Sequence, residues 1–185
     1  MRNRWLASIL YCGVVVLGSC ATIPPVTVRS TLPRGSEVAV VMFRDCVIAG
    51  QEDCDGSGLS AGSIFARVFS ERPGWRAVPI SRPVSPREPL DDGAAVAFAK
   101  GKGFRYVLNG DVEDYYRVAP MTFRTERAGV SVRLLNTENG DILAFFSHRM
   151  NSQSNLTTPD AMIEKFASRV RDAAIPVVES QNSSK

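Results

Sequence analysis

Asp111 and Glu113 are the two acidic residues of this sequence whose spacing best suits hydrolytic chemistry. Side chains two positions apart on a strand point to the same face, so an expected strand over residues 104–112, continuing towards residue 116, would present both carboxylates together. Paired carboxylates can act as acid and base on a glycan such as peptidoglycan. A solvated strand end explains the same pair, because it lies where the strand leaves the core. We therefore assign no catalytic residue and keep an envelope glycan hydrolase as an alternative function.

Tyr115, Tyr116 and Arg117 follow this pair directly. Tyrosine and arginine are enriched among the residues that contribute most to binding at protein interfaces. The three residues therefore form a candidate partner surface.

A glycine-rich stretch from Gly56 to Gly62, with the spacing G-x-G-x-x-x-G, lies between an expected strand and an expected helix. Such turns let a pyrophosphate approach the backbone and a helix N-terminus, and Arg82 after the next strand could contact a 2′-phosphate. Asp53-Cys54-Asp55-Gly56 is similar to half of a calcium loop but lacks the closing glutamate. The alternative is a flexible start of a helix with Gly62 packed closely. Small-ligand or metal binding at residues 53–62 remains a second alternative function, and we expect no cofactor.

His148 is the only histidine, so no histidine cluster can hold zinc. On its expected strand it shares a face with Ile142, Ala144, Phe146 and Met150. This pattern favours a packed histidine over a catalytic base, and we assign no metal ligand.

Cys20 ends the most informative segment for the location of the protein. Arg2 and Arg4 precede an apolar run from Leu6 to Leu17, which is the charge and hydrophobicity pattern of a secretory signal. The run is shorter than the ~20 residues that a membrane-spanning helix needs. A plain secretory signal with an unrelated cysteine is the alternative interpretation.

Leu17-Gly18-Ser19-Cys20 resembles the lipobox of bacterial lipoproteins. The resemblance implies cleavage before Cys20, a diacylglycerol on its sulfur and an acyl chain such as palmitate on its amine. Ala21 stands where an aspartate would favour inner-membrane retention. In a Gram-negative host we therefore expect the periplasmic face of the outer membrane, with this lipid anchor as the contact with the membrane.

Cys46 and Cys54 lie eight residues apart in one expected loop. In an exported protein they are plausible disulfide partners, and two reduced thiols are the alternative. The formal charge is +3, from which the loss of Arg2 and Arg4 with the signal subtracts two, leaving +1. A surface so close to neutral gives no reason to expect nucleic acid as a partner.

The sequence divides into four parts. Residues 1–19 form the lipoprotein signal peptide, and residues 20–36 form the lipidated cysteine with a proline-rich tether. Residues 37–178 form a single globular α/β domain, and residues 179–185 a disordered tail. The sixteen tether residues after Cys20 would reach at most about 50 Å.

Hydrophobic periodicity predicts the elements of the domain. The expected strands are Val38 to Phe43, Trp75 to Ile80, Phe104 to Val112, Thr125 to Leu135 and Ile142 to Met150. Three helices are expected, one capped by Ser60, one by Asp91 or Asp92 and one by Thr158 with Pro159 at its first position. The order β-α-β-α-β-β-β-α predicts a three-layer α/β/α sandwich on a five-stranded mixed sheet. The first three strands should be parallel, and an Asn139-Gly140 hairpin should join the last two.

This order, behind the lipobox, resembles a group of small periplasmic domains: the amino-terminal domain of TolB, the curli-secretion lipoprotein and the lipoprotein activator of penicillin-binding proteins. It looks closer to small single-domain bacterial lipoproteins of this arrangement. The matching positions include Gly56-Ser57-Gly58, Tyr106-Val107-Leu108 and the turn from Thr137 to Asp141. The resemblance implies a non-enzymatic, outer-membrane-anchored docking or assembly module that binds envelope or secretion proteins or copies of itself. Unlike the curli-secretion lipoprotein, the chain lacks an obvious pair of long amphipathic segments that could build a membrane barrel. Compared with the activator of penicillin-binding proteins, its tether looks short for reaching an inner-membrane enzyme.

Overall fold

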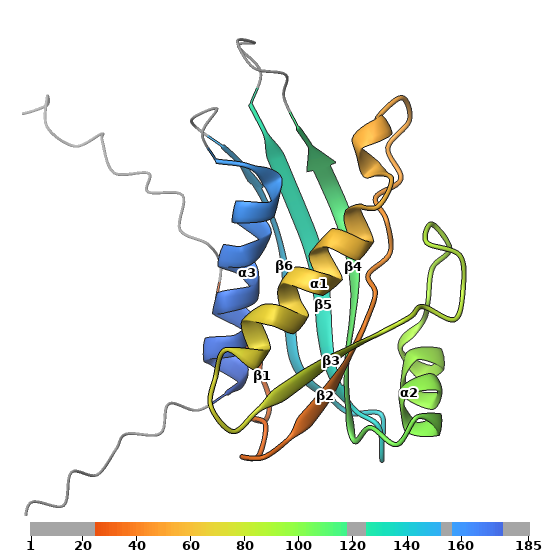
Figure 1. The fold of residues 1–185 in the computed structure, drawn as a ribbon, viewed down its shortest axis with the longest axis vertical. Coiled ribbons are helices and arrows are strands. Elements are labelled where there is room, and N and C mark those ends of the chain that lie inside the picture. The colour runs from red at the N-terminus through yellow and green to blue at the C-terminus, as the bar shows by residue number, and fades with distance from the viewer. Residues whose placement is uncertain (1–24, 118–124, 153–156, 176–185) are drawn as a thin grey trace, which may run out of the picture.

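The computed structural model describes residues 25–117, 125–152 and 157–175 (Figure 1). Cys20 and the rest of the signal and lipobox lie outside this range. The strands are β1 (Thr27–Val28), β2 (Glu37–Val41), β3 (Arg76–Ile80), β4 (Tyr106–Tyr116), β5 (Arg127–Asn136) and β6 (Ile142–Asn151). The helices are α1 (Ser57–Ser70), α2 (Asp92–Gly101) and α3 (Pro159–Ala174), with a short 3-10 turn at Glu52–Cys54. No helix among the described residues is long and apolar enough to cross a bilayer.

The strands form one mixed sheet in the order β1-β6-β5-β4-β2-β3. β2 is parallel to β3 and β4, whereas β4, β5 and β6 pair antiparallel. The predicted parallel strands and the predicted hairpin are therefore confirmed. Gly140 takes a φ of 78° in the hairpin turn, a backbone conformation that favours glycine.

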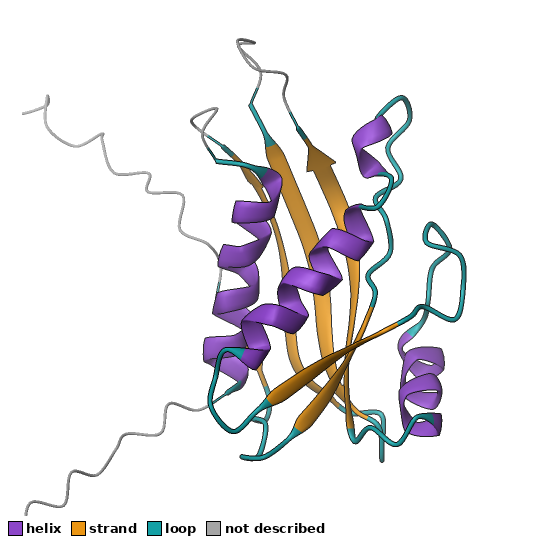
Figure 2. Ribbon diagram, in the orientation of Figure 1, coloured by secondary structure: helices purple, strands orange, loops and turns teal. Residues whose placement is uncertain are grey.

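Helices cover both faces of the sheet, with α1 and α3 on one face and α2 on the other. Figure 2 shows α1 and α3 lying in front of the strands. β2 contributes to the hydrophobic clusters on both faces of the sheet, since its successive side chains point to opposite faces. Val38 and Val40 join the larger cluster with α1 and α3, and Ala39 and Val41 join the smaller cluster with α2. α2 covers only part of its side of the sheet. On the rest of that side, β4, β5 and β6 carry mainly polar side chains.

The sheet has six strands, so the prediction of five was wrong. The additional strand lies in the expected tether, where Thr27 and Val28 pair with Phe145 and Ala144 of β6. Leu32, from the same expected tether, is 1% exposed in the core. The segment from Thr27 onward is thus part of the folded domain.

The predicted helix starts are confirmed for two helices and wrong for one. The side chains of Asp91 and Thr158 accept hydrogen bonds from the backbone N–H of Ala94 and Ala161, respectively. α1 begins at Ser57 after a left-handed Gly56, three residues before the predicted cap at Ser60. Its first turn is capped by the carboxylate of Asp45, from the preceding loop.

Candidate docking site at the disulfide end of the sheet

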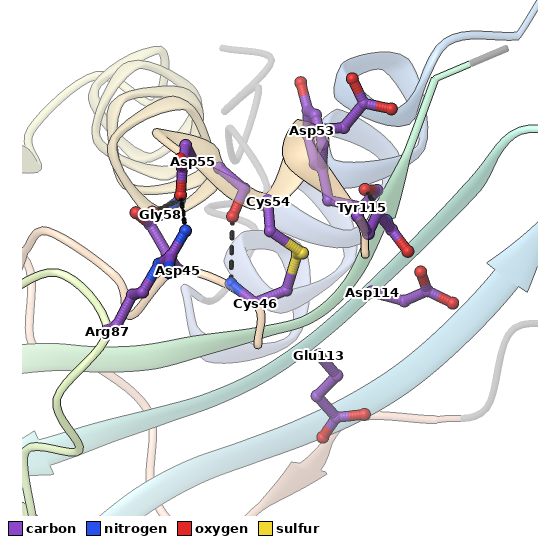
Figure 3. Close-up of a disulfide and its surroundings, with 12 residues drawn as sticks. Asp45, Cys46, Asp53, Cys54, Asp55, Gly58, Arg87, Glu113, Asp114 and Tyr115 are labelled. Carbon is purple, nitrogen blue, oxygen red and sulfur yellow. Dashed lines mark hydrogen bonds and ion pairs between the residues drawn. A yellow bond between two sulfur atoms is a disulfide. The ribbon is translucent and has the colours of Figure 1, made fainter. Parts of the chain in front are cut away.

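One end of the domain gathers the disulfide loop, the N-termini of α1 and α3 and the last residues of β4 (Figure 1). The loop after β2 is closed by the Cys46–Cys54 disulfide, which confirms that predicted pair (Figure 3). Both cysteines are buried, at 1% and 2% exposure. The Cys46 backbone N–H donates to Oγ of Ser57 at 3.1 Å, so the loop is fastened to the first turn of α1.

The N-terminus of α1 is already occupied by a carboxylate of the chain itself. Asp45, 6% exposed, accepts hydrogen bonds from the backbone N–H of Gly58 at 2.7 Å and of Gly56 at 3.1 Å (Figure 3). A bound phosphate would need these same N–H groups and the same end of the helix dipole. The geometry therefore argues against the dinucleotide interpretation of the glycine-rich stretch.

Packing explains two glycines of this stretch, Gly58 and Gly62, whereas Gly56 takes a left-handed backbone conformation. A Cβ on Gly58 would lie 2.1 Å from the carbonyl oxygen of Phe43, and a Cβ on Gly62 would lie 3.2 Å from Cα of Met42. Close approach of α1 to the end of β2 thus requires a glycine at position 58. In the described ranges, no three histidine, cysteine, aspartate or glutamate side chains converge as metal ligands would.

Asp160 connects the two helix N-termini to the end of β4. Its Oδ1 accepts hydrogen bonds from the hydroxyls of Ser60 on α1 and Tyr115 on β4, each at 2.7 Å. Its Oδ2 accepts from Nη2 of Arg117 at 2.7 Å, and that same Nη2 donates to the Tyr115 hydroxyl at 2.7 Å. Burial, followed by the bond to the Asp160 carboxylate, raises the pKa of Tyr115.

Tyr115 is buried, at 4% exposure, so its assignment to a partner surface was wrong. The physical reason is a β-bulge between Val112 and Asp114, which interrupts the alternation of β4 and turns Tyr115 towards α1 and α3, on the same face as Val112. Tyr116 is half-buried under the Arg127 guanidinium, which lies 5.0 Å from its ring centroid. Arg117 is exposed. A shallow hollow of about 320 Å³ beside Arg117 and Ser60 is open to solvent.

Asp111 and Glu113 lie on the sheet face opposite α1 and α3, and each faces an arginine. Asp111 is bound by Nη2 of Arg133 at 3.0 Å, and Nε of the same arginine binds Asp92 of α2 at 2.7 Å. Glu113 lies 3.8 Å from Arg149 and accepts a hydrogen bond from Ser147. These are links between neighbouring strands and α2, and they do not form the acid–base pair of a glycan hydrolase.

His148 packs against aromatic rings, as its strand position predicts. Its ring centroid lies 5.5 Å from that of Phe166 on α3 and 6.3 Å from that of Phe146. Burial, and secondarily the charge of Arg169, lowers the pKa of His148. Ile142 does not share this face, because the register of β5 and β6 shifts between Leu134 and Leu135 and sends Ile142 to the cluster of α2.

Asp45 and Asp160 organise this end of the sheet, and the sequence analysis assigned no role to either. Asp160 follows Thr158 and Pro159, so an acidic residue in the first turn of a helix was visible, but its partners lie 43 to 100 residues away. Asp45 sits one residue before Cys46, in a loop with no periodicity. Nothing local points to its role as the cap of a helix twelve residues later.

No family model matches the sequence, and no curated protein matches it. Solved structures do share the fold. Two structures of PelC from Paraburkholderia phytofirmans, both described as dodecamers, align with this chain. The first, a single-residue variant, has 19% identity over 84% of this chain and 99% of that chain at a TM-score of 0.63. The second has 22% identity over 81% and 96% at a TM-score of 0.58.

Two further structures are more distant. The lipoprotein GNA1162 from Neisseria meningitidis has 17% identity over 73% of this chain and 94% of that chain, at a TM-score of 0.47. TolB from Acinetobacter baumannii, from the group that the sequence resembles, has 12% identity over 80% of this chain and 29% of that chain, at 0.41. Identities this low establish the fold alone, and the fold is that of PelC subunits.

Proposed function

We propose that this chain is a non-enzymatic, lipid-anchored module of the bacterial envelope that assembles with copies of itself. The observation that supports this most is the alignment with PelC, since 84% of this chain matches 99% of a subunit from a dodecamer. Because the match covers nearly the whole PelC subunit, the helices and strands that form the surface are arranged alike in the two proteins. Self-assembly is therefore the function that the fold supports best.

The side chains that could do chemistry are engaged in holding the domain together. Asp111 pairs with Arg133, and Asp45 occupies the helix N-terminus that a phosphate would need. Asp160 binds three partners from two other elements. Charged groups used in this way favour a structural and binding role over catalysis.

The anchor in this proposal is Cys20, and its location is the periplasmic face of the outer membrane. The lipobox and Ala21 support it. Tyr116 and Arg117 are our candidates for docking a second envelope protein, because both are accessible at the disulfide end of the sheet.

Expression of the full chain in a Gram-negative host tests both parts. We expect the wild type to incorporate a labelled fatty acid and the Cys20→Ala variant to lose that label. The detergent-solubilised wild type should have a mass of several chains by light scattering corrected for detergent. A protein that stays monomeric across the accessible concentration range would overturn self-assembly, and an unlabelled wild type would overturn the anchor.

A further inference from the structure

Phe145 is an apolar side chain that the fold leaves partly exposed. Three large hydrophobic side chains are exposed in the described part of the chain: Val47 at 63%, Leu59 at 61% and Phe145 at 40%. Phe145 is the only aromatic one among them. Its neighbours on β6, Ala144 and Phe146, point into the core, so alternation places Phe145 outward on the opposite face.

A hollow of about 400 Å³ lies at the other side of the domain, beyond the carboxyl ends of β2 and β3. Its lining is largely apolar and includes Met42, Leu59, Val84 and Pro86. Leu59, on the first turns of α1, is thus an exposed hydrophobic residue at the hollow. A cavity with apolar walls favours an apolar occupant over water.

Arg82 forms one wall of this hollow. Its Nη1 donates to the carbonyl of Met42 at 3.3 Å, and its Nη2 donates to the carbonyl of Glu88. Burial lowers the pKa of Arg82. A partly desolvated guanidinium beside an apolar cavity is a good neighbour for the face of an aromatic ring.

Phe145 and the hollow lie towards opposite edges of the sheet. In the order β1-β6-β5-β4-β2-β3, β6 is next to one edge, while the hollow follows β2 and the edge strand β3. Two complementary features on different sides of one molecule produce a head-to-tail contact, and such contacts generate rings when the rotation closes. A surface that binds the same surface of another copy would produce only a two-fold dimer.

We propose that Phe145 of one copy inserts into the hollow lined by Met42, Leu59, Val84 and Pro86 of the next copy. This inference rests on the proposed self-assembly and names its contact. Buried aromatic residues in pockets dominate the binding energy of interfaces, so one such contact per subunit boundary can control assembly.

Three variants of the full-length lipoprotein test the contact by light scattering of the detergent-solubilised protein. Phe145→Ser removes the inserted side chain, and Ser81→Trp fills the hollow from an exposed position in its lining. Each should weaken self-association at least ~10-fold and give monomers at concentrations where the wild type is assembled. Val47→Ser is the matched control, because it removes an exposed hydrophobic side chain that belongs to neither feature. Circular dichroism and thermal unfolding of each variant should match the wild type.

A mixing experiment then tests the direction of the contact. Phe145→Ser keeps an intact hollow, and Ser81→Trp keeps an intact Phe145, so their mixture should form mixed dimers and nothing larger. A mixture that stays monomeric, or a Phe145→Ser variant that stays assembled, would overturn the contact. A folded Phe145→Ser variant that remains assembled but binds phosphatidylglycerol vesicles more weakly would assign Phe145 to the membrane instead. A monomeric wild type would overturn self-assembly itself, which separates that failure from a failure of this contact.

Discussion

The hydroxyl of Tyr115 donates a hydrogen bond of 2.7 Å to Oδ1 of Asp160, although the two residues are 45 positions apart. This bond joins the end of β4 to the first turn of α3. Tyr115→Phe should lower the free energy of unfolding by about 1–2 kcal/mol, because it leaves a partly buried carboxylate with one donor fewer. Urea unfolding measures this loss. Tyr106→Phe, at a half-buried tyrosine of the same strand outside the cluster, is the control, and equal losses in the two variants would contradict the role of Asp160.

The Cys46–Cys54 disulfide should stabilise the domain by restricting the unfolded chain. For a loop of this length the chain-entropy estimate is about 2–3 kcal/mol. The double variant Cys46→Ser/Cys54→Ser should therefore unfold at lower urea, and reductant should lower the stability of the wild type towards that of the variant. Reductant should not change the variant itself. A wild type with two titratable thiols after native purification would contradict the disulfide.

Gly58 should tolerate no side chain, because an added Cβ would meet the carbonyl oxygen of Phe43 at 2.1 Å. The obstacle is backbone, so it cannot move aside as a side chain would. Gly58→Ala should lower the free energy of unfolding by at least ~2 kcal/mol. Gly101→Ala is the control, since its Cβ would have nothing within 4 Å, and its stability should change by less than ~1 kcal/mol. Equal effects would show that the clash is relieved without cost.

His148 should make stability depend on pH near neutrality. Its pKa is lower in the folded protein than in the unfolded chain, so the unfolded chain binds more protons in the range between the two pKa values. The free energy of unfolding should therefore rise as pH increases from 5.5 to 7.5. It should fall as acid protonates the unfolded chain. His148→Phe keeps an aromatic ring and should abolish this slope, whereas an unchanged slope would assign it to other groups.

The elements of this fold could be predicted where periodicity was long. In β5, Val130, Val132 and Leu134 alternate with Ser131 and Arg133, and the strand spans Arg127–Asn136. The two-residue β1 carries no such signal, since its stability comes from pairing with β6 more than 100 residues later. A register shift between Leu134 and Leu135 likewise changes the face of Ile142 without any change in its sequence pattern.

The site could be predicted only where its contacts were local. The eight-residue spacing of Cys46 and Cys54 suggested their bond, but the burial of Tyr115 depends on helices that follow and precede it in the chain. Tyr115 is buried because the β-bulge between Val112 and Asp114 turns it towards the face that α1 and α3 cover. The residue types around Tyr115 do not indicate a bulge, so the sequence alone predicts a surface position for it.

If Cys20 carries a lipid, the pairing of β1 with β6 shortens the chain segment between that lipid and the domain. Only residues 21–26 would then separate Cys20 from Thr27, a reach of about 20 Å at full extension. Copies held at one height meet by diffusion in two dimensions, which raises their effective concentration relative to a soluble domain. In a closed cyclic ring, symmetry would also bring every anchor to the same rim. Many lipids would then hold one assembly, so a single copy could leave the bilayer far more easily than the ring.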